Sequence, residues 1–172
     1  MNKIQTNKAE VDQSVRIEEL TRDTIISVAN KEFEYAVRFP VRLKRQLYEL
    51  FRLRGMRKKF GPWVFAAAIA QLLEKSNIRV SDVVIDIEYP GYERDILMII
   101  KNIHSDMYVS FTTVGKNSPA HEKAYFALKG KKAVESTLHY SDFRAWIGAK
   151  QKDWRTVTPR VYEDSQSNQS AN

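Results

Sequence analysis

The feature that most limits the fold of this chain is the alternation of strand-like and helix-like segments in its second half. Residues 82–88 and 107–114 are rich in β-branched and aromatic residues, as buried strands are. Each is followed by a segment with apolar residues at helical spacing, over 92–103 and 119–128. Strand, helix, strand and helix with short connections are typical of a right-handed parallel unit, so this half predicts an α/β sheet.

The first half adds two strands and two helices. Residues 25–30 and 33–39 are separated by a short polar turn and predict a β-hairpin. Apolar stripes then predict helices over 40–55 and 61–75, the second of which is apolar on all sides and therefore buried. The whole order is ββ, αα, βαβα, which predicts a single α/β domain with a mixed sheet and a leading β-hairpin.

Length and polarity set the expected limits of this domain. The 172 residues suffice for one domain with a substantial core. Residues 1–14 and 163–172 are polar and lack a hydrophobic period, so we expect flexible tails there and the domain over 15–162. The chain has no cysteine, no signal-peptide pattern and no apolar run near the roughly 20 residues that span a bilayer. We therefore expect a cytoplasmic protein without a membrane partner; nothing indicates its oligomeric state.

The positive charge is concentrated in residues 42–59. This segment holds eight Lys or Arg against one acidic residue, so its net charge of +7 equals that of the whole chain. Such focusing suits contacts with nucleic-acid phosphates, while its aromatic residues either stack on bases or point into the core. The alternative is a solvated helix face. The candidate nucleic-acid contacts, together with a lysine farther along the chain, are Arg42, Lys44, Arg45, Arg52, Arg54, Arg57, Lys58, Lys59 and Lys116.

Acidic residues interrupt the strand predicted over 82–88. In VSDVVIDIEYPGYERD, Asp86 and Glu88 occupy the same side of the strand, and Glu93 follows the Pro-Gly turn. Carboxylates in a buried strand need compensation, by a metal ion, by a cationic partner or by exposure at the strand end. The metal alternative makes Asp86, Glu88 and Glu93 candidate ligands. In the structural alternative, Asp86 pairs with a cation and Glu93 favours the positive end of a helix dipole.

A third candidate lies at the start of the helix over 119–128. Ser118 has the character of an N-cap, and Pro119 suits the first helical position. His121 then falls in the first turn, beside a loop that contains Lys116. This arrangement predicts a small anion pocket in which His121 contacts a phosphate or moves a proton, if the pocket adjoins Asp86 and Glu88. A histidine at a helix start with a purely structural role is the alternative.

The element order, together with the stretch IDIEYPGYE, resembles the ribonuclease H-like superfamily over roughly residues 24–130. That resemblance implies carboxylates on the first strand, on a later strand and on a closing helix, which hold two magnesium or manganese ions for phosphodiester cleavage. It makes Asp86 and Glu88 ligands and catalytic residues, with His121 or Glu122 at the closing-helix position. The chain departs from the pattern in its first expected strand, TIISVAN, which carries no carboxylate.

Two hypotheses follow from the sequence. In the first, the chain binds nucleic acid, either DNA or RNA, through residues 42–59 and cleaves phosphodiesters with Mg or Mn held near Asp86 and Glu88. In the second, it is a noncatalytic protein-interaction or regulatory module with a ribonuclease H-like fold, and the acidic residues form structural pairs.

Overall fold

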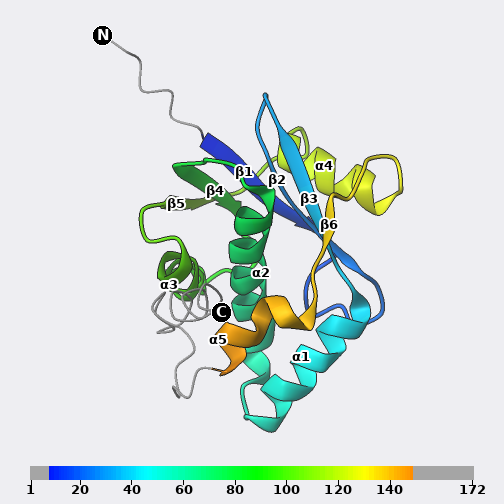
Figure 1. Cartoon of the computed structure of the whole chain (residues 1–172), viewed down its shortest axis with the longest axis vertical. Coiled ribbons are helices and arrows are strands. Elements are labelled where there is room, and N and C mark those ends of the chain that lie inside the picture. The colour runs from blue at the N-terminus through cyan, green and yellow to red at the C-terminus, as the bar shows by residue number, and fades with distance from the viewer. Residues whose placement is uncertain (1–7, 149–172) are drawn as a thin grey trace, which may run out of the picture.

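The structure is a computed structural model that describes residues 8–148 (Figure 1). Within these residues the chain forms six strands, five α-helices and two 3-10 helices. In chain order the elements are β1 (Lys8–Ser14), β2 (Thr24–Ala29), β3 (Glu34–Phe39), α1 (Val41–Leu53), η1 (Arg57–Lys59), α2 (Phe60–Ser76), β4 (Asp82–Asp86), α3 (Glu93–Ile103), β5 (Tyr108–Thr112), α4 (Pro119–Leu128), β6 (Ser136–Thr137), η2 (Tyr140–Phe143) and α5 (Arg144–Gly148).

The six strands form one mixed sheet in the order β5-β4-β1-β2-β3-β6. β1, β2 and β3 pair antiparallel, β4 and β5 run parallel to β1, and β6 runs parallel to β3. The prediction of an α/β domain with a mixed sheet is therefore confirmed. The hairpin of β2 and β3, the two following helices and the βαβα unit are all present, but the hairpin is not the leading element.

The leading element is β1, which the sequence had assigned to a flexible tail. That prediction is wrong for residues 8–14, because they form a central strand paired with β2 on one side and β4 on the other. Ala9 and Val11 are buried in the core, whereas the other face of the strand carries Glu10 and Asp12. This mixture of apolar and charged residues in a short segment conceals a central strand, which is ordinarily a continuous apolar run.

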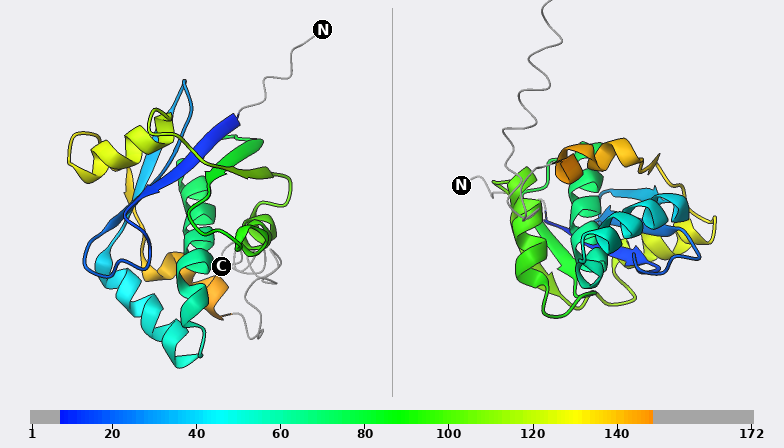
Figure 2. Two further views of the ribbon diagram at one scale, coloured as in Figure 1. Left: turned by 180° about the vertical axis from the view of Figure 1, so that it is seen from behind. Right: turned by 90° about the horizontal axis from the view of Figure 1, so that it is seen from below.

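Helices cover both faces of the sheet (Figures 1 and 2). On one face lies α2, whose residues 60–73 are all buried, as predicted from its apolar surface. α1, α3 and α5 surround α2 and share its hydrophobic core. On the other face, α4 packs against β1, β2 and β3, and β4 and β5 extend beyond it (Figure 2). The domain therefore has three layers, with part of one sheet face left uncovered by α4.

α4 begins and ends as the sequence predicts. The hydroxyl of Ser118 accepts a hydrogen bond from the backbone N–H of His121 at 3.0 Å, Pro119 is the first helical residue, and Gly130 lies beyond the end with φ of 71°. Small residues let the helix approach the sheet closely, since the Ser27 hydroxyl donates to the carbonyl of Ala120 at 2.6 Å. This close packing fixes where the first turn of α4, including His121, meets β1.

α1 contains a buried lysine that the sequence had placed among the nucleic-acid contacts. Lys44 is fully buried, and its ammonium donates to the backbone carbonyls of Arg16 and Glu19 and to the Thr24 hydroxyl. Burial lowers the pKa of Lys44 to about 8, against the attraction of nearby acids such as Glu19. The prediction that Lys44 contacts nucleic acid is therefore wrong: the side chain fastens α1 to the β1–β2 loop.

The two termini of the chain lie outside the described residues. These are residues 1–7 and 149–172, so the predicted C-terminal tail over 163–172 is not addressed by the structure. The aromatic segment before residue 149 is described: Phe143 stacks on Phe39 at 5.5 Å between ring centroids, and both belong to the core on the α2 side.

Replacing Lys44 with methionine tests its buried position through pH. The folded protein releases the Lys44 proton near pH 8, whereas the unfolded chain keeps it until about pH 10.5. The unfolded state therefore binds more protons in this window, so the wild type should gain stability relative to Lys44→Met as pH rises from 8 to 10.5, by up to about 3 kcal/mol. Urea unfolding at several pH values measures the difference.

Arg42→Met is the matched control, because Arg42 is exposed on the same helix and arginine does not titrate in this range. A difference between wild type and Lys44→Met that stays constant from pH 8 to 10.5 contradicts the assignment.

Candidate metal centre

Three carboxylates from two segments of the chain, β1 and the end of β4, converge at one edge of the sheet. Asp12 lies near the end of β1, Asp86 is the last residue of β4, and Glu88 follows two residues later. One oxygen from each lies within 4.8 Å of the others. The register explains the convergence, because Val11 pairs with Ile85 in parallel and the next residue of each strand is an aspartate.

Asp12 is the most deeply buried of the three, with 2% of its surface exposed. Its Oδ1 accepts the backbone N–H of Gln13 at 2.6 Å, and its Oδ2 lies 2.8 Å from Nδ1 of His121. Burial raises the pKa of Asp12, and the negative charge of Asp86 adds to the rise, while the bonds from His121 and Gln13 oppose it. The folded chain therefore keeps a carboxylate where its charged form is unfavourable.

Backbone hydrogen bonds at the end of β4 position the other two acids. Oδ1 of Asp86 accepts the N–H of Val114 at 2.6 Å, which ties the end of β4 to the segment between β5 and α4. The N–H of Glu88 donates to the carbonyl of Asp86 at 2.9 Å, so the chain turns sharply and brings Glu88 back toward the cluster. Burial raises the pKa of Glu88; Asp86 and Asp12 raise it further, and the guanidinium of Arg16 lowers it.

Tyr89 connects this turn to the β1–β2 loop. Its buried hydroxyl donates to Oε2 of Glu18 at 2.7 Å and accepts the N–H of Ile17 at 3.3 Å. The start of α2 is packed closely against both partners, because a Cβ on Gly61 would lie 2.9 Å from Glu18 Oε2 and from Tyr89 Cε1. The absence of a side chain at Gly61 thus lets α2, the loop and the turn meet at one point.

The structure brings together most, but not all, of the acidic site predicted from sequence. Asp86, Glu88 and His121 lie together, as predicted if the helix start adjoins the acidic strand. Glu93 is not part of the cluster: its Oε2 accepts the N–H of Gly91 at 2.8 Å, at the start of α3. The prediction of Glu93 as a metal ligand is therefore wrong for this arrangement.

Asp12 is the site residue that sequence reasoning missed. The assumed first strand, TIISVAN, is β2, and the actual first strand carries Asp12. The one available signal was the alternation of Ala9 and Val11 with polar residues in KAEVDQS, and it involves only two apolar residues. The first strand of the sheet in chain order therefore does carry a carboxylate.

Most cations of the basic segment lie on the surface, but its aromatic residues do not. Phe51 and Phe60 are buried and pack edge to face at 5.7 Å, so the alternative that they point into the core is confirmed. Two of the exposed cations have local partners: Arg45 donates to the carbonyl of Leu20, and Arg52 pairs with Glu49 at 2.7 Å. The exposed candidates are Arg42, Arg45, Arg52, Arg54, Arg57, Lys58 and, in the loop before α4, Lys116, while Lys59 is half-buried over the Trp63 ring at 4.4 Å.

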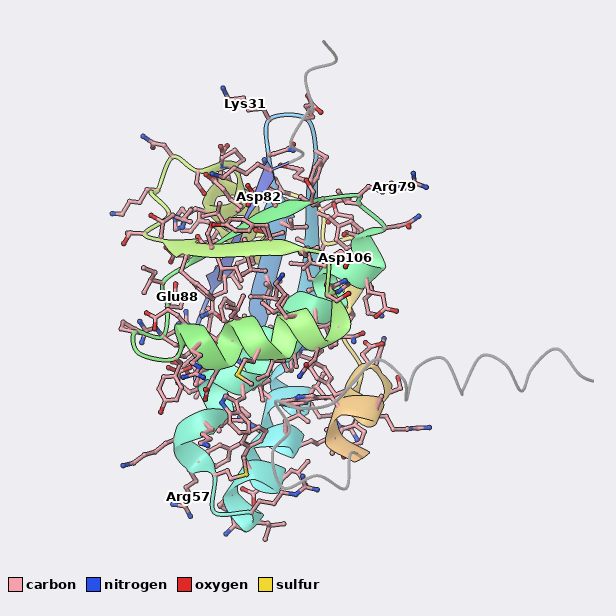
Figure 3. All side chains as sticks on the ribbon, turned by 90° about the vertical axis from the view of Figure 1, so that its left-hand side faces the viewer. Lys31, Arg57, Arg79, Asp82, Glu88 and Asp106 are labelled. Atoms are coloured by element: carbon pink, nitrogen blue, oxygen red, sulfur yellow. The ribbon has the colours of Figure 1, made fainter. Side chains whose placement is uncertain are left out.

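The basic segment and the acidic cluster lie at the same end of the β1–β4 pair. η1 leads directly into α2, and Gly61 at the start of α2 contacts Glu18 and Tyr89 beside the cluster. Figure 3 shows Glu88 and Arg57 on the same side of the molecule. The exposed cations of the basic segment therefore lie on the same side of the molecule as Glu88.

Two other features of the described residues bear on function. A shallow pocket of about 510 Å³ lies between the segments that precede β4 and β5, lined by Arg79, His104 and Asp106 among others, and contains none of the predicted site residues. Among residues 8–148, no helix combines the length and the apolar character needed to cross a bilayer.

Comparison with known proteins adds no assignment to this geometry. No protein-family model matches the chain, nor does any curated protein or solved structure. The placement of Asp12, Asp86, Glu88 and their neighbours therefore indicates what the site can do.

The raised pKa of Asp12 predicts how the metal-free protein responds to pH. Between the ordinary pKa of 3.8 and the raised value, the folded state binds more protons than the unfolded state. The wild type should therefore lose stability relative to Asp12→Asn as pH rises above about 4, and the difference should level off above the raised pKa. Urea unfolding in EDTA from pH 4 to 8 measures this trend. A difference that is flat or grows with pH contradicts the assigned burial of the charge.

Proposed function

We propose that this domain is ribonuclease H-like and cleaves phosphodiester bonds of nucleic acid with magnesium or manganese held by Asp12, Asp86 and Glu88. The observation that carries the proposal is the meeting of these three carboxylate oxygens within 4.8 Å at the carboxyl ends of two parallel strands. Ligands of α/β sheets commonly bind beyond this end of the strands.

The donor set suits a hard divalent cation. Magnesium and manganese prefer carboxylate oxygens, and the mutual repulsion of the three acids is relieved when a cation lies among them. The raised pKa values of Asp12 and Glu88 reflect first the loss of water on burial and then the repulsion by neighbouring acids. The existing compensation is limited, since Arg16 pairs with Glu88 and His121 contacts Asp12, while Asp86 receives a neutral backbone N–H.

The order of the site residues also supports the proposal. The resemblance to ribonuclease H-like proteins implies a carboxylate on the first strand, one on a later strand and a polar group on a closing helix. Asp12 on β1, Asp86 at the end of β4 and His121 on α4 occupy these three places. The carboxylate of Asp12 on the first strand supports the resemblance, which lacked a first-strand carboxylate when β2 was taken as the first strand.

The chain's own residues have distinct roles in this proposal. The chemistry that a divalent cation supplies in such a site is neutralisation of charge on a phosphate oxygen. When Asp12 is ionised, it accepts the hydrogen of His121 Nδ1 and thereby orients the imidazole ring. Nε2 of His121 is then the atom at which the ring can take up or release a proton. The exposed cations of residues 42–59 contribute phosphate contacts that hold the strand.

Asp86→Asn tests the metal-dependent part of the proposal. Adding manganese at about 100 times its Kd should raise the Tm of the wild type by roughly 5–10 °C, because ligand binding stabilises the folded state. Asp86→Asn should fold, because its amide oxygen can still accept the Val114 N–H, but it should lose this response. It should also lose manganese-dependent cleavage of labelled DNA and RNA. Thermal unfolding and gel assays measure the two effects.

Glu93→Gln is the matched control, since Glu93 lies nearby in sequence but outside the cluster. It should keep both the manganese response and cleavage. If the wild type binds manganese but cleaves no substrate, the metal site is supported and the nuclease activity is rejected. That result favours the noncatalytic alternative. No manganese response in the wild type rejects the proposal as a whole.

Replacing exposed cations of the basic segment tests whether this segment binds nucleic acid. Arg57→Gln combined with Lys58→Gln should weaken binding and reduce the slope of log affinity against log salt by about 1.4–1.8, because two fewer phosphate contacts release fewer counterions. Fluorescence anisotropy with duplex and single-stranded oligonucleotides between 50 and 200 mM salt, approximately the range in which such effects are large, gives both values.

The matched control is the double variant Lys8→Gln and Lys31→Gln, which removes the same amount of positive charge elsewhere. Lys8 is exposed at the start of β1, and Lys31 is exposed in the β2–β3 turn. Figure 3 shows Lys31 at the end of the molecule opposite Arg57. Equal effects of the two double variants contradict a role for the basic segment and indicate a general charge effect.

A further inference from the structure

The segment that follows β1 is strained and places one arginine beside the carboxylates. Val15 has a φ of 71°, in the left-handed region that β-branched residues rarely adopt. Such a conformation is strained and persists when surrounding contacts enforce it. Here the contacts are those of the next residues, because Ile17 and Glu18 are both bonded to Tyr89. The chain therefore turns abruptly after β1 and directs Arg16 toward Glu88.

Arg16 combines a fixed backbone with an exposed side chain. Its carbonyl accepts hydrogen bonds from Lys44 Nζ, from the Thr24 hydroxyl and from the N–H of Glu19. Its side chain is 57% exposed, with Nε 3.1 Å from Glu88 Oε2 and the guanidinium 5.8 Å from the Tyr89 ring centroid. Nη1 also lies 3.9 Å from Glu18. The side chain can therefore change partner without any movement of the loop.

We propose that Arg16 is a phosphate-binding residue of the site, held on Glu88 in the metal-free domain and released to the nucleic-acid phosphate when a divalent cation binds Glu88. This inference rests on the proposed function, because it requires the cation. It assigns to Arg16 a role that couples metal binding to substrate binding.

The chemistry of the three groups supports this exchange. A divalent cation bound to Glu88 neutralises part of the carboxylate charge that attracts Arg16, and the cation also repels the guanidinium. A guanidinium presents paired N–H donors that match the oxygens of a phosphate, so the arriving substrate offers Arg16 a replacement for Glu88. Because the Arg16 side chain is 57% exposed, water weakens its ion pair with the partly buried Glu88, which favours the exchange. The neighbouring Glu18 is retained by Tyr89 and keeps the guanidinium near the site.

Arg16→Gln tests the exchange with two measurements that move in opposite directions. Manganese affinity, measured by isothermal titration calorimetry, should increase about two- to fivefold, because the competing cation is gone. The second measurement is the affinity for a fluorescein-labelled oligonucleotide in calcium divided by the affinity in EDTA. This gain should fall roughly tenfold in Arg16→Gln, because the variant has no guanidinium to bind the phosphate. Calcium is used in the second measurement because it too binds carboxylate oxygens. If the substitution only damaged the structure of the site, the manganese affinity and the oligonucleotide gain would both decrease.

Two further variants control for charge and geometry. Arg22→Gln removes the same charge from the same loop, where Arg22 is exposed, and should leave both quantities within about twofold of the wild type. Arg16→Lys keeps the charge but loses the planar donor pair, so it should retain wild-type manganese affinity and lose part of the oligonucleotide gain. Circular dichroism establishes that each variant is folded.

The outcomes separate this inference from the proposed function. If the wild type binds no manganese, both are rejected. If the wild type binds manganese but Arg16→Gln has unchanged or weaker manganese affinity, only the role of Arg16 is overturned. The same holds if the oligonucleotide gain survives in Arg16→Gln, or if Arg22→Gln reproduces its effects.

Discussion

The parallel pairing of β1 with β4 is the constraint on which the rest of the site depends. Because Val11 lies opposite Ile85, Asp12 and Asp86 follow at the same level and on the same face. Two aspartates placed side by side repel each other, and burial of Asp12 strengthens the repulsion. The core on the opposite face of both strands fixes this register, since a shift by one residue would move Val11 and Ile85 out of it.

The surroundings of the cluster hold the remaining groups in place without neutralising it. Val114 fixes Asp86 through its backbone, and Tyr89 joins the turn after β4 to the β1–β2 loop. The close approach at Gly61 links both to the start of α2, which continues from the basic segment. These contacts therefore connect the proposed metal ligands, the proposed phosphate contact of Arg16 and the basic segment, although they come from distant parts of the sequence.

Much of the frame could be predicted from the sequence, because its elements have strong local signals. The buried helix α2, the hairpin and the capped helix α4 follow from periodicity, Pro and Gly positions and the Ser118 cap. β1 could not be found in the same way, because its stabilisation comes from neighbours on both sides and its second face belongs to the site. Two predictions were wrong for a related reason, Glu93 as a metal ligand and Lys44 as a phosphate contact. Both followed from residue type, but tertiary structure decides which atoms a side chain contacts.

The central claim is that Asp12, Asp86 and Glu88 together hold a divalent cation. A crystal of the full chain soaked in manganese, with anomalous data collected above the manganese absorption edge, tests it most directly. We expect an anomalous peak within about 2.0–2.4 Å of oxygens from all three residues, with Arg16 displaced from Glu88. Absence of a peak among these carboxylates at saturating manganese, with Arg16 still paired to Glu88, would contradict it.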